Sequence, residues 1–213
     1  MSKFLLRVVL ISFSLFVFGN AAAALTENKD YILIKNQPAN HENNQGKIEV
    51  IEFFSYGCSY CYKLEPEIVS WLAEQPSNVT FKRVAIPRKG KWFAYAKFFY
   101  ALGMISPTEQ TRIMPLIYKA IHEQKLNLED ENELLDWAES ENVDRHLLEQ
   151  FYQSDDVEQQ VSQALDLAKS YELQYVPTII VNNKYQIVLD STNNYAGTKE
   201  KLKELIELAA AND

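Results

Sequence analysis

Strand-like and helix-like segments follow one another along this chain in an order that few folds can accommodate. Residues 48–55 are rich in β-branched and aromatic side chains, which predicts a buried strand, and residues 79–86 repeat that pattern. Between them the pattern becomes helical from Cys58 onward. The apolar positions near one face of this expected helix are Tyr62, Ile68, Val69 and Leu72. The sequence therefore predicts a strand–helix–strand unit.

The middle of the chain is helical in pattern for about 80 residues, and such a stretch cannot be a structureless loop. Helices are expected over 92–102, where Gly103 would end the first one, and over 106–124, 130–139, 144–153 and 157–172. Ser106 to Glu109 form a capping box with proline at the first helical position. The apolar stripe expected on the last helix comprises Val157, Val161, Leu165 and Ala168. The stretch should pack as its own subdomain.

Strand patterns return near the end of the chain, over residues 178–182 and 185–189, and an amphipathic helix is expected over 197–211. An α/β thioredoxin fold with an inserted α-helical subdomain accounts for this order. The expected organisation is a first part of the thioredoxin fold at 25–90, the inserted subdomain at 91–172 and the second part at 173–213.

The first 24 residues resemble a secretory signal peptide rather than part of the fold. Lys3 and Arg7 precede the apolar run 8–18, and four alanines follow at 21–24. A membrane anchor is the alternative, but the apolar run is shorter than the roughly 20 residues that span a bilayer. We therefore expect an exported protein whose signal peptide is cleaved.

The charge of the chain argues against nucleic acid as a partner. The net charge is −8, and without Lys3 and Arg7 it becomes −10, whereas phosphates require a basic surface. The one basic run, Arg88-Lys89-Gly90-Lys91, is expected to be a solvated loop; steering of an acidic partner is the alternative.

Only two cysteines are present, Cys58 and Cys61, and a bond between them would close almost no loop. Such a bond hardly constrains the unfolded chain, so a chemical role explains the pair better than a structural one. An inert local disulfide remains an alternative. Half of a zinc site is another, although His41, His122 and His146 lie in different predicted segments. No metal is expected.

The position of the pair predicts its chemistry. A helix start carries unpaired N–H groups and partial positive charge, which favour a thiolate and should lower the pKa of Cys58. Cys61, one turn later, should be less exposed and within bonding distance of Cys58. This pattern is typical of a redox-active pair that exchanges disulfides with a visiting thiol.

Several segments resemble the DsbA family of bacterial periplasmic disulfide oxidoreductases. They are Val50 to Ser55, the cysteine pair with Tyr62 behind it, Tyr175-Val176-Pro177-Thr178 and Val181 to Tyr185. The resemblance implies a dithiol oxidase that oxidises cysteine pairs in folding exported proteins, with no cofactor beyond its own disulfide. It also implies a quinone-linked membrane oxidase of the DsbB type as a partner.

The resemblance further implies roles for individual residues. Val176-Pro177 would be a cis peptide bond beside the cysteines that presents the main chain of Val176 to substrate, with Ser59 and Tyr60 also in contact; a proline that begins a strand is the alternative. Glu52 would move protons for Cys61 and pair with Lys82. The alternative is a Glu52 that faces solvent.

Glu65 could join the Glu52 pair, since it lies one turn after Cys61. One departure from the family is the dipeptide between the cysteines, Ser59-Tyr60 instead of the family's best-known Pro-His. Tyrosine cannot supply positive charge to the Cys58 thiolate, so we expect a weaker oxidant than the Pro-His members.

Two other functions fit the sequence. A disulfide isomerase or reductase of the same fold would use the same cysteines, although isomerases of this fold commonly carry a dimerisation domain, for which residues 25–47 are too short. A chaperone-like peptide-binding module would need no catalytic cysteine. A Cys58→Ala variant would separate an enzyme from a peptide-binding module, because peptide binding would survive and oxidation would stop.

Overall fold

The computed structural model describes residues 25–35, 37–38, 46–87 and 92–212. The predicted signal peptide, the basic run 88–91 and His41 lie outside the described residues. The strands are β1 (Tyr31–Leu33), β2 (Ile48–Phe54), β3 (Val79–Ala85), β4 (Thr178–Val181) and β5 (Tyr185–Ile187). The helices are α1 (Ser59–Leu72), α2 (Phe93–Ile105), α3 (Pro107–His122), α4 (Glu131–Ser140), α5 (Arg145–Tyr152), α6 (Asp155–Ser170) and α7 (Thr198–Ala211).

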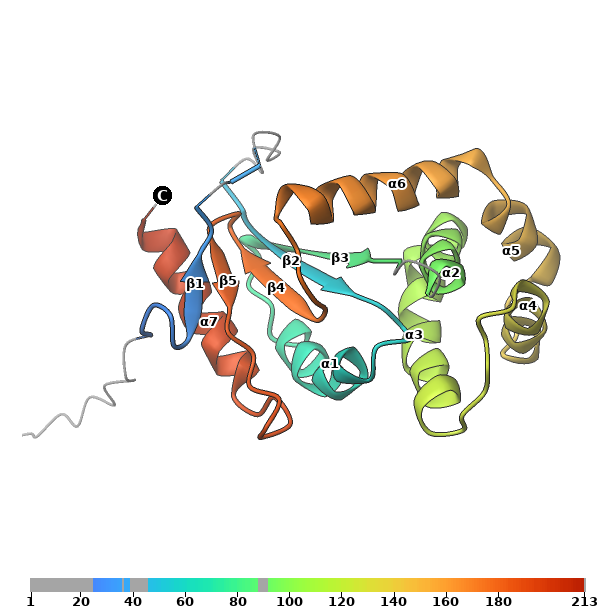
Figure 1. Cartoon of the computed structure of the whole chain (residues 1–213), viewed down its shortest axis with the longest axis horizontal. Coiled ribbons are helices and arrows are strands. Elements are labelled where there is room, and N and C mark those ends of the chain that lie inside the picture. The colour runs from blue at the N-terminus through green and yellow to red at the C-terminus, as the bar shows by residue number, and fades with distance from the viewer. Residues whose placement is uncertain (1–24, 36, 39–45, 88–91, 213) are drawn as a thin grey trace, which may run out of the picture.

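The five strands form one sheet in the order β1-β5-β4-β2-β3 (Figure 1). Only β2 and β3 run parallel, and the other neighbours are antiparallel. Helices α1 and α7 pack on one face, where Trp71 and Leu205 lie in the same apolar cluster as Val50. Helix α6 covers the other face through Ala164 and Ala168. The sheet is therefore an inner layer, and both faces of strand β2, which lies between β4 and β3, are buried.

Helices α2 to α5 gather at the end of the sheet and share an apolar core with Phe54, Tyr56 and the two cysteines (Figure 1). Helix α6 leads back from them and runs along the sheet. The helices predicted for the inserted subdomain are thus present, but the last of them also covers the sheet. The exact boundaries at 91 and 172 stay a prediction.

Two sequence expectations about the helices were wrong in detail. Gly103 does not end α2, which continues to Ile105. A Cβ at Gly103 would lie 2.8 Å from the side-chain amide nitrogen of Gln110 in α3. The glycine thus admits a close helix neighbour. Val69 and Leu165 are exposed, because the buried stripes contain Leu64, Ile68 and Trp71 in α1 and Val157, Val161 and Ala164 in α6.

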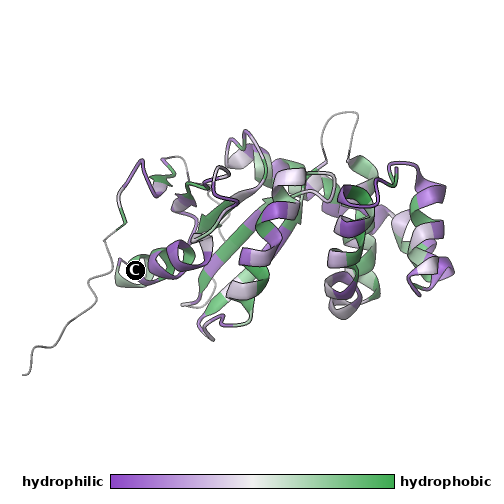
Figure 2. Ribbon diagram, turned by 90° about the horizontal axis from the view of Figure 1, so that it is seen from below, coloured by the Kyte–Doolittle hydropathy of each residue, from purple (hydrophilic) through white to green (hydrophobic). Residues whose placement is uncertain are grey.

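Helices α3, α4, α5 and α6 each begin at a serine or aspartate side chain that accepts a main-chain N–H. The Ser106 hydroxyl accepts the Glu109 N–H at 3.0 Å, which confirms the predicted cap. Figure 2 shows hydrophobic stripes beside hydrophilic ones along the helices, as expected for helices that bury one side. Within the part of the chain that the structure describes, no helix is both long and apolar enough to span a bilayer.

Candidate active site

Cys58 caps the N-terminus of α1. Its backbone is extended, with φ −87° and ψ 111°, and its Sγ accepts the Cys61 N–H at 3.3 Å. A helix start leaves such N–H groups without intrahelical partners. The sulfur takes the place that a serine or aspartate oxygen usually has in a cap, so negative charge on it is stabilised by a main-chain donor.

The two thiols differ in acidity. A hydrogen bond from the Cys61 thiol, with those from the N–H groups of Cys61 and Tyr60, lowers the pKa of Cys58 to about 7 against the opposing effect of burial. Burial raises the pKa of Cys61 well above its ordinary value, and its hydrogen bond to Cys58 and the charges of Cys58 and Glu52 add to this. Near neutral pH Cys58 therefore exchanges between thiol and thiolate, while Cys61 stays protonated.

Both cysteines are free thiols and both are largely buried, Cys58 with 4% of its surface exposed and Cys61 with none. The order agrees with the sequence expectation, although the difference is small. Tyr60 and Tyr175 are more than half exposed. Ser59 is exposed as well, so the surface around Cys58 presents aromatic and hydroxyl groups to a visiting chain.

The Val176-Pro177 peptide bond is cis, as expected. It lies beside the cysteines, because the Cys58 thiol donates to the Val176 carbonyl at 3.5 Å. The Thr178 hydroxyl donates to the Tyr175 carbonyl at 2.8 Å and ties the loop to the start of β4. The loop therefore brings main-chain groups to the reactive sulfur from a segment 118 residues away.

Glu52 is fully buried in β2 and does not face solvent. Its Oε2 accepts from the Nε of Arg83 at 2.8 Å, and the Nη2 of Arg83 also donates to Glu65 at 2.8 Å. One cation thus joins two carboxylates beneath Cys61. Burial, partly opposed by Arg83, raises the pKa of Glu65 to about 7, so Glu65 can exchange a proton near neutral pH.

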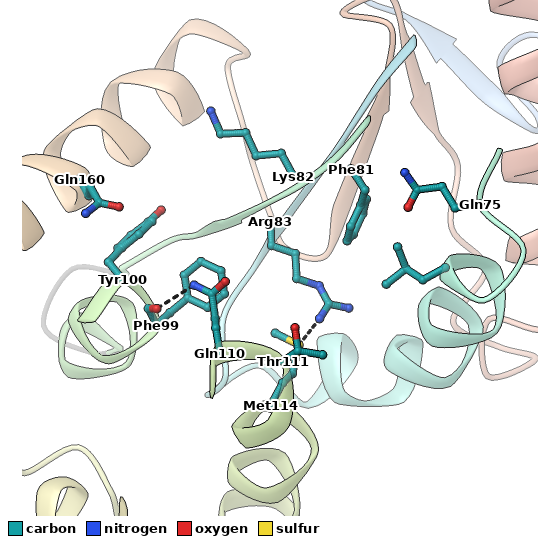
Figure 3. Close-up of a pocket in the computed structure, with 11 residues that line it drawn as sticks. Gln75, Phe81, Lys82, Arg83, Phe99, Tyr100, Gln110, Thr111, Met114 and Gln160 are labelled. Atoms are coloured by element: carbon teal, nitrogen blue, oxygen red, sulfur yellow. Dashed lines mark hydrogen bonds between the residues drawn. The ribbon is translucent and has the colours of Figure 1, made fainter. Parts of the chain in front are cut away.

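The partner of Glu52 is Arg83, and the expectation of Lys82 was wrong. In the parallel register of β2 and β3, Glu52 lies opposite Arg83 and Ile51 lies opposite Lys82. Successive side chains of a strand point to opposite faces, and Figure 3 shows Lys82 and Arg83 directed away from each other. Lys82 is exposed on the face that α6 covers. Strand alternation separates the two cations onto opposite faces, but the register against β2 decides which of them meets Glu52.

Two neighbours of the active-site turn were not predicted. A Cβ at Gly57 would overlap the indole of Trp92, so only glycine fits directly before Cys58. The Nε2 of His122 lies 2.7 Å from the Tyr56 carbonyl, and its ring stacks on Tyr62 at 5.1 Å. Both contacts join the turn to the helical subdomain. Sequence spacing gives no signal for them, because they depend on how that subdomain docks.

No group of three or more histidine, cysteine, aspartate or glutamate side chains that could hold a metal occurs among the described residues. His122 is half-buried against aromatic rings.

Comparison with known proteins places this geometry in a family. A model described as "DSBA-like thioredoxin domain" matches residues 89–200. The thiol:disulfide interchange protein DsbA of Burkholderia cepacia is 36% identical over 87% of this chain and 86% of its own length. That of Pseudomonas syringae pv. tomato is 31% identical over 97% of this chain and 95% of its own.

Solved structures agree with this result. The crystal structure of Pseudomonas aeruginosa DsbA matches with a TM-score of 0.75 and 30% identity, covering 89% of this chain and 97% of that one. Reduced DsbA1 from Neisseria meningitidis has the same fold, with a TM-score of 0.76 at 21% identity over 89% and 97% of the two chains. The thioredoxin fold with a helical insertion, expected from the sequence, is thereby confirmed, and the chain belongs to the DsbA-like family of thiol:disulfide oxidoreductases.

Proposed function

We propose that this protein is an exported dithiol oxidase that donates its Cys58–Cys61 disulfide to cysteine pairs of other proteins in the periplasm. The observation that carries the proposal is the cap geometry: the Cys58 Sγ receives a main-chain N–H at 3.3 Å, and its pKa falls to about 7 while that of Cys61 rises. Relatives named DsbA support the reaction and the compartment.

The reaction has two displacement steps. A substrate thiolate attacks the Cys58 sulfur of the oxidised enzyme, a mixed disulfide forms, and Cys61 leaves as a thiolate that takes up a proton. The second substrate thiolate then attacks the substrate sulfur of the mixed disulfide, and Cys58 leaves. Two electrons pass from substrate to enzyme. The low pKa of Cys58 makes it a good leaving group and drives the second step forward.

The residues around the cysteine pair have two roles in this reaction, proton transfer and substrate binding. Glu52 is buried beside Cys61 and accepts from Arg83, which also holds Glu65; this cluster supplies the proton when Cys61 is expelled. The Val176 carbonyl, 3.5 Å from Cys58 in the reduced form, binds the main chain of the substrate before Pro177, as in strand addition. Exposed Tyr60 and Ser59 contact its side chains.

Each turnover leaves the enzyme as a dithiol, which must be reoxidised. The cysteine pair is the only redox group that the proposal requires, and no other cofactor is involved. By family resemblance the oxidant is a quinone-linked membrane oxidase of the DsbB type, and the substrates are folding exported proteins with free cysteines.

The test uses oxidised protein and a reduced peptide that carries two cysteines. Wild type should oxidise the peptide stoichiometrically, and Cys58→Ser should not. Ser162→Ala, the same kind of change at an exposed position of α6 far along the chain from the cysteines, is the matched control and should retain the full rate. Oxidising activity that survives in Cys58→Ser would remove the basis of the proposal.

The direction of electron flow needs a second measurement. Acid quenching and alkylation of the exported protein in cells would report the redox state of Cys58 and Cys61. A mostly oxidised pair supports the oxidase. A mostly reduced pair would favour the isomerase or reductase instead.

A further inference from the structure

Strand β3 is the outer edge of the sheet, and half of its main-chain groups point away from β2. The Ile48 N–H donates to the Asn78 carbonyl and the Ile86 N–H to the Phe54 carbonyl, at the two ends of the β2–β3 ladder. In a parallel pair the residues alternate in the direction of their main-chain groups. Even-numbered residues of β3 therefore bond to β2, and odd-numbered ones face outward.

The two ends of this outer edge are covered by local contacts. The Val79 N–H donates to the Pro76 carbonyl, and the Val79 carbonyl accepts from Gln75 at 2.7 Å. At the other end the Ala85 carbonyl accepts from the Tyr100 hydroxyl at 3.3 Å. Between them, the outward N–H and C=O groups of Phe81 and Arg83 have no hydrogen-bond partner among the described residues.

A cavity of about 550 Å³ lies along this open part of the edge (Figure 3). It has the size of a ligand site, and it is bordered by residues from α1, α2, α3 and α6. A second, smaller cavity of about 160 Å³ continues past Lys82 and Arg83 toward Leu167. Neither cavity includes the cysteines, Val176 or Pro177, so neither contains the reacting sulfurs or the loop beside them; only Arg83 is shared with the cluster around Glu52.

The two sides of the edge differ in chemistry. On the side of Phe81 and Arg83 the larger cavity is bordered by the apolar Leu72 and Met114 and by the polar Gln75 and Thr111. The guanidinium of Arg83 on this side is already paired with Glu52 and Glu65. On the other side Lys82 is exposed and lines both cavities. Among the described residues, no aspartate or glutamate lines either cavity, although the chain as a whole carries a net charge of −8. The open edge thus combines a partly apolar side, where the one cation is already paired, with a side that carries the exposed cation of Lys82.

We propose that this edge binds an extended segment of another polypeptide in which apolar and acidic residues alternate. The segment adds as a sixth strand, bonded to the main chain of Phe81 and Arg83. Because side chains of a strand alternate between faces, its apolar residues enter the larger cavity and an acidic residue meets Lys82. The covered ends at Val79 and Ala85 restrict the contact to a few residues, which favours a peptide segment over a whole sheet edge.

The experiment titrates reduced, ¹⁵N-labelled protein with a blocked seven-residue peptide of alternating valine and glutamate, which has no cysteine. The amide signals of Phe81, Arg83 and Ala85 should shift, and their hydrogen exchange should slow. Thr111→Trp, on the exposed helix face beside the cavity, should abolish these shifts. Lys82→Glu should weaken binding about fivefold or more, whereas Lys119→Glu, a charge reversal on α3 outside both cavities, should not.

Three controls identify the occupant. A peptide with lysine in place of glutamate, and one with N-methylated main chain at alternate positions, should both fail to bind. Equal binding of the methylated peptide would contradict strand addition, and so would an absence of shifts at the three amides or shifts confined to the surroundings of Cys58. The same signals changing on dilution of the free protein would identify a second copy as the occupant and overturn the proposal.

Discussion

Cys58 and Cys61 lie within one turn of the same helix, yet their surroundings move their pKa values in opposite directions. Cys58 ends in the cap position, where hydrogen-bond donors converge on its sulfur. Cys61 is enclosed by apolar side chains with the carboxylate of Glu52 nearby. The difference shows that backbone position and burial, rather than residue type, assign the attacked and the buried sulfur. The dipeptide Ser59-Tyr60 therefore adjusts the pKa of Cys58 but does not cause the difference in pKa between the two cysteines.

The largest effect is expected on the Cys61 side, from Arg83→Met. It leaves Glu52 buried without its cation, which should cost about 3–5 kcal/mol of unfolding free energy. Lys82→Met removes a cation on the opposite face of the same strand and should change stability by less than about 0.5 kcal/mol. Urea unfolding of both variants gives the comparison. Equal losses, or a larger loss for Lys82→Met, would mean that the pairing is wrong.

A smaller effect is expected on the Cys58 side, from Gly57→Ala. The new methyl group must displace Trp92, and overpacking of this kind costs about 1–3 kcal/mol. The turn that positions Cys58 should also move, so the pKa of Cys58 should rise toward 9. Thermal unfolding and thiolate absorbance measure the two effects. Ser162→Ala, at an exposed position of α6, is the neutral control, and a Gly57→Ala protein with unchanged stability and pKa would show that the indole contact is dispensable.

The smallest effect is expected from Tyr60→His, which adds a cation between the cysteines. Tyr60 is exposed and lies near Lys63, so the histidine should fit without repacking. A fall of one pKa unit at Cys58 corresponds to about a tenfold change in equilibrium, and the variant should be more oxidising by about that factor against glutathione. Tyr60→Phe should stay within about twofold of wild type. A less oxidising Tyr60→His would contradict the charge argument.

The sequence predicted the order of the helices and strands because they carry clear hydrophobic periods, and several of the helices also carry a capping residue. Ser106, for example, marks the start of α3 in the sequence because it belongs to a capping box, and its hydroxyl caps the helix in the structure. It also predicted the cysteine pair and the loop before Pro177. These features depend on local pattern or on family resemblance, and both can be read from short segments.

The remaining errors concern contacts between elements. Gly103 resembles a helix end when only the sequence is considered, but in the structure its missing side chain leaves room for Gln110 of α3. Arg83 and Lys82 are adjacent cations, and only the register against β2 tells which one meets Glu52. Trp92 and His122 reach the active-site turn from the helical subdomain, whose docking no sequence period describes.

Thiolate absorbance at 240 nm, followed against pH in the reduced protein, tests the central claim most directly. Because the pKa of Cys58 is lowered, its thiolate should persist as the pH falls and disappear through a transition near pH 7. That transition should be absent in Cys58→Ser and present in Cys61→Ser, while Cys61 stays protonated above pH 9. A single transition near pH 9 for both cysteines would contradict the account.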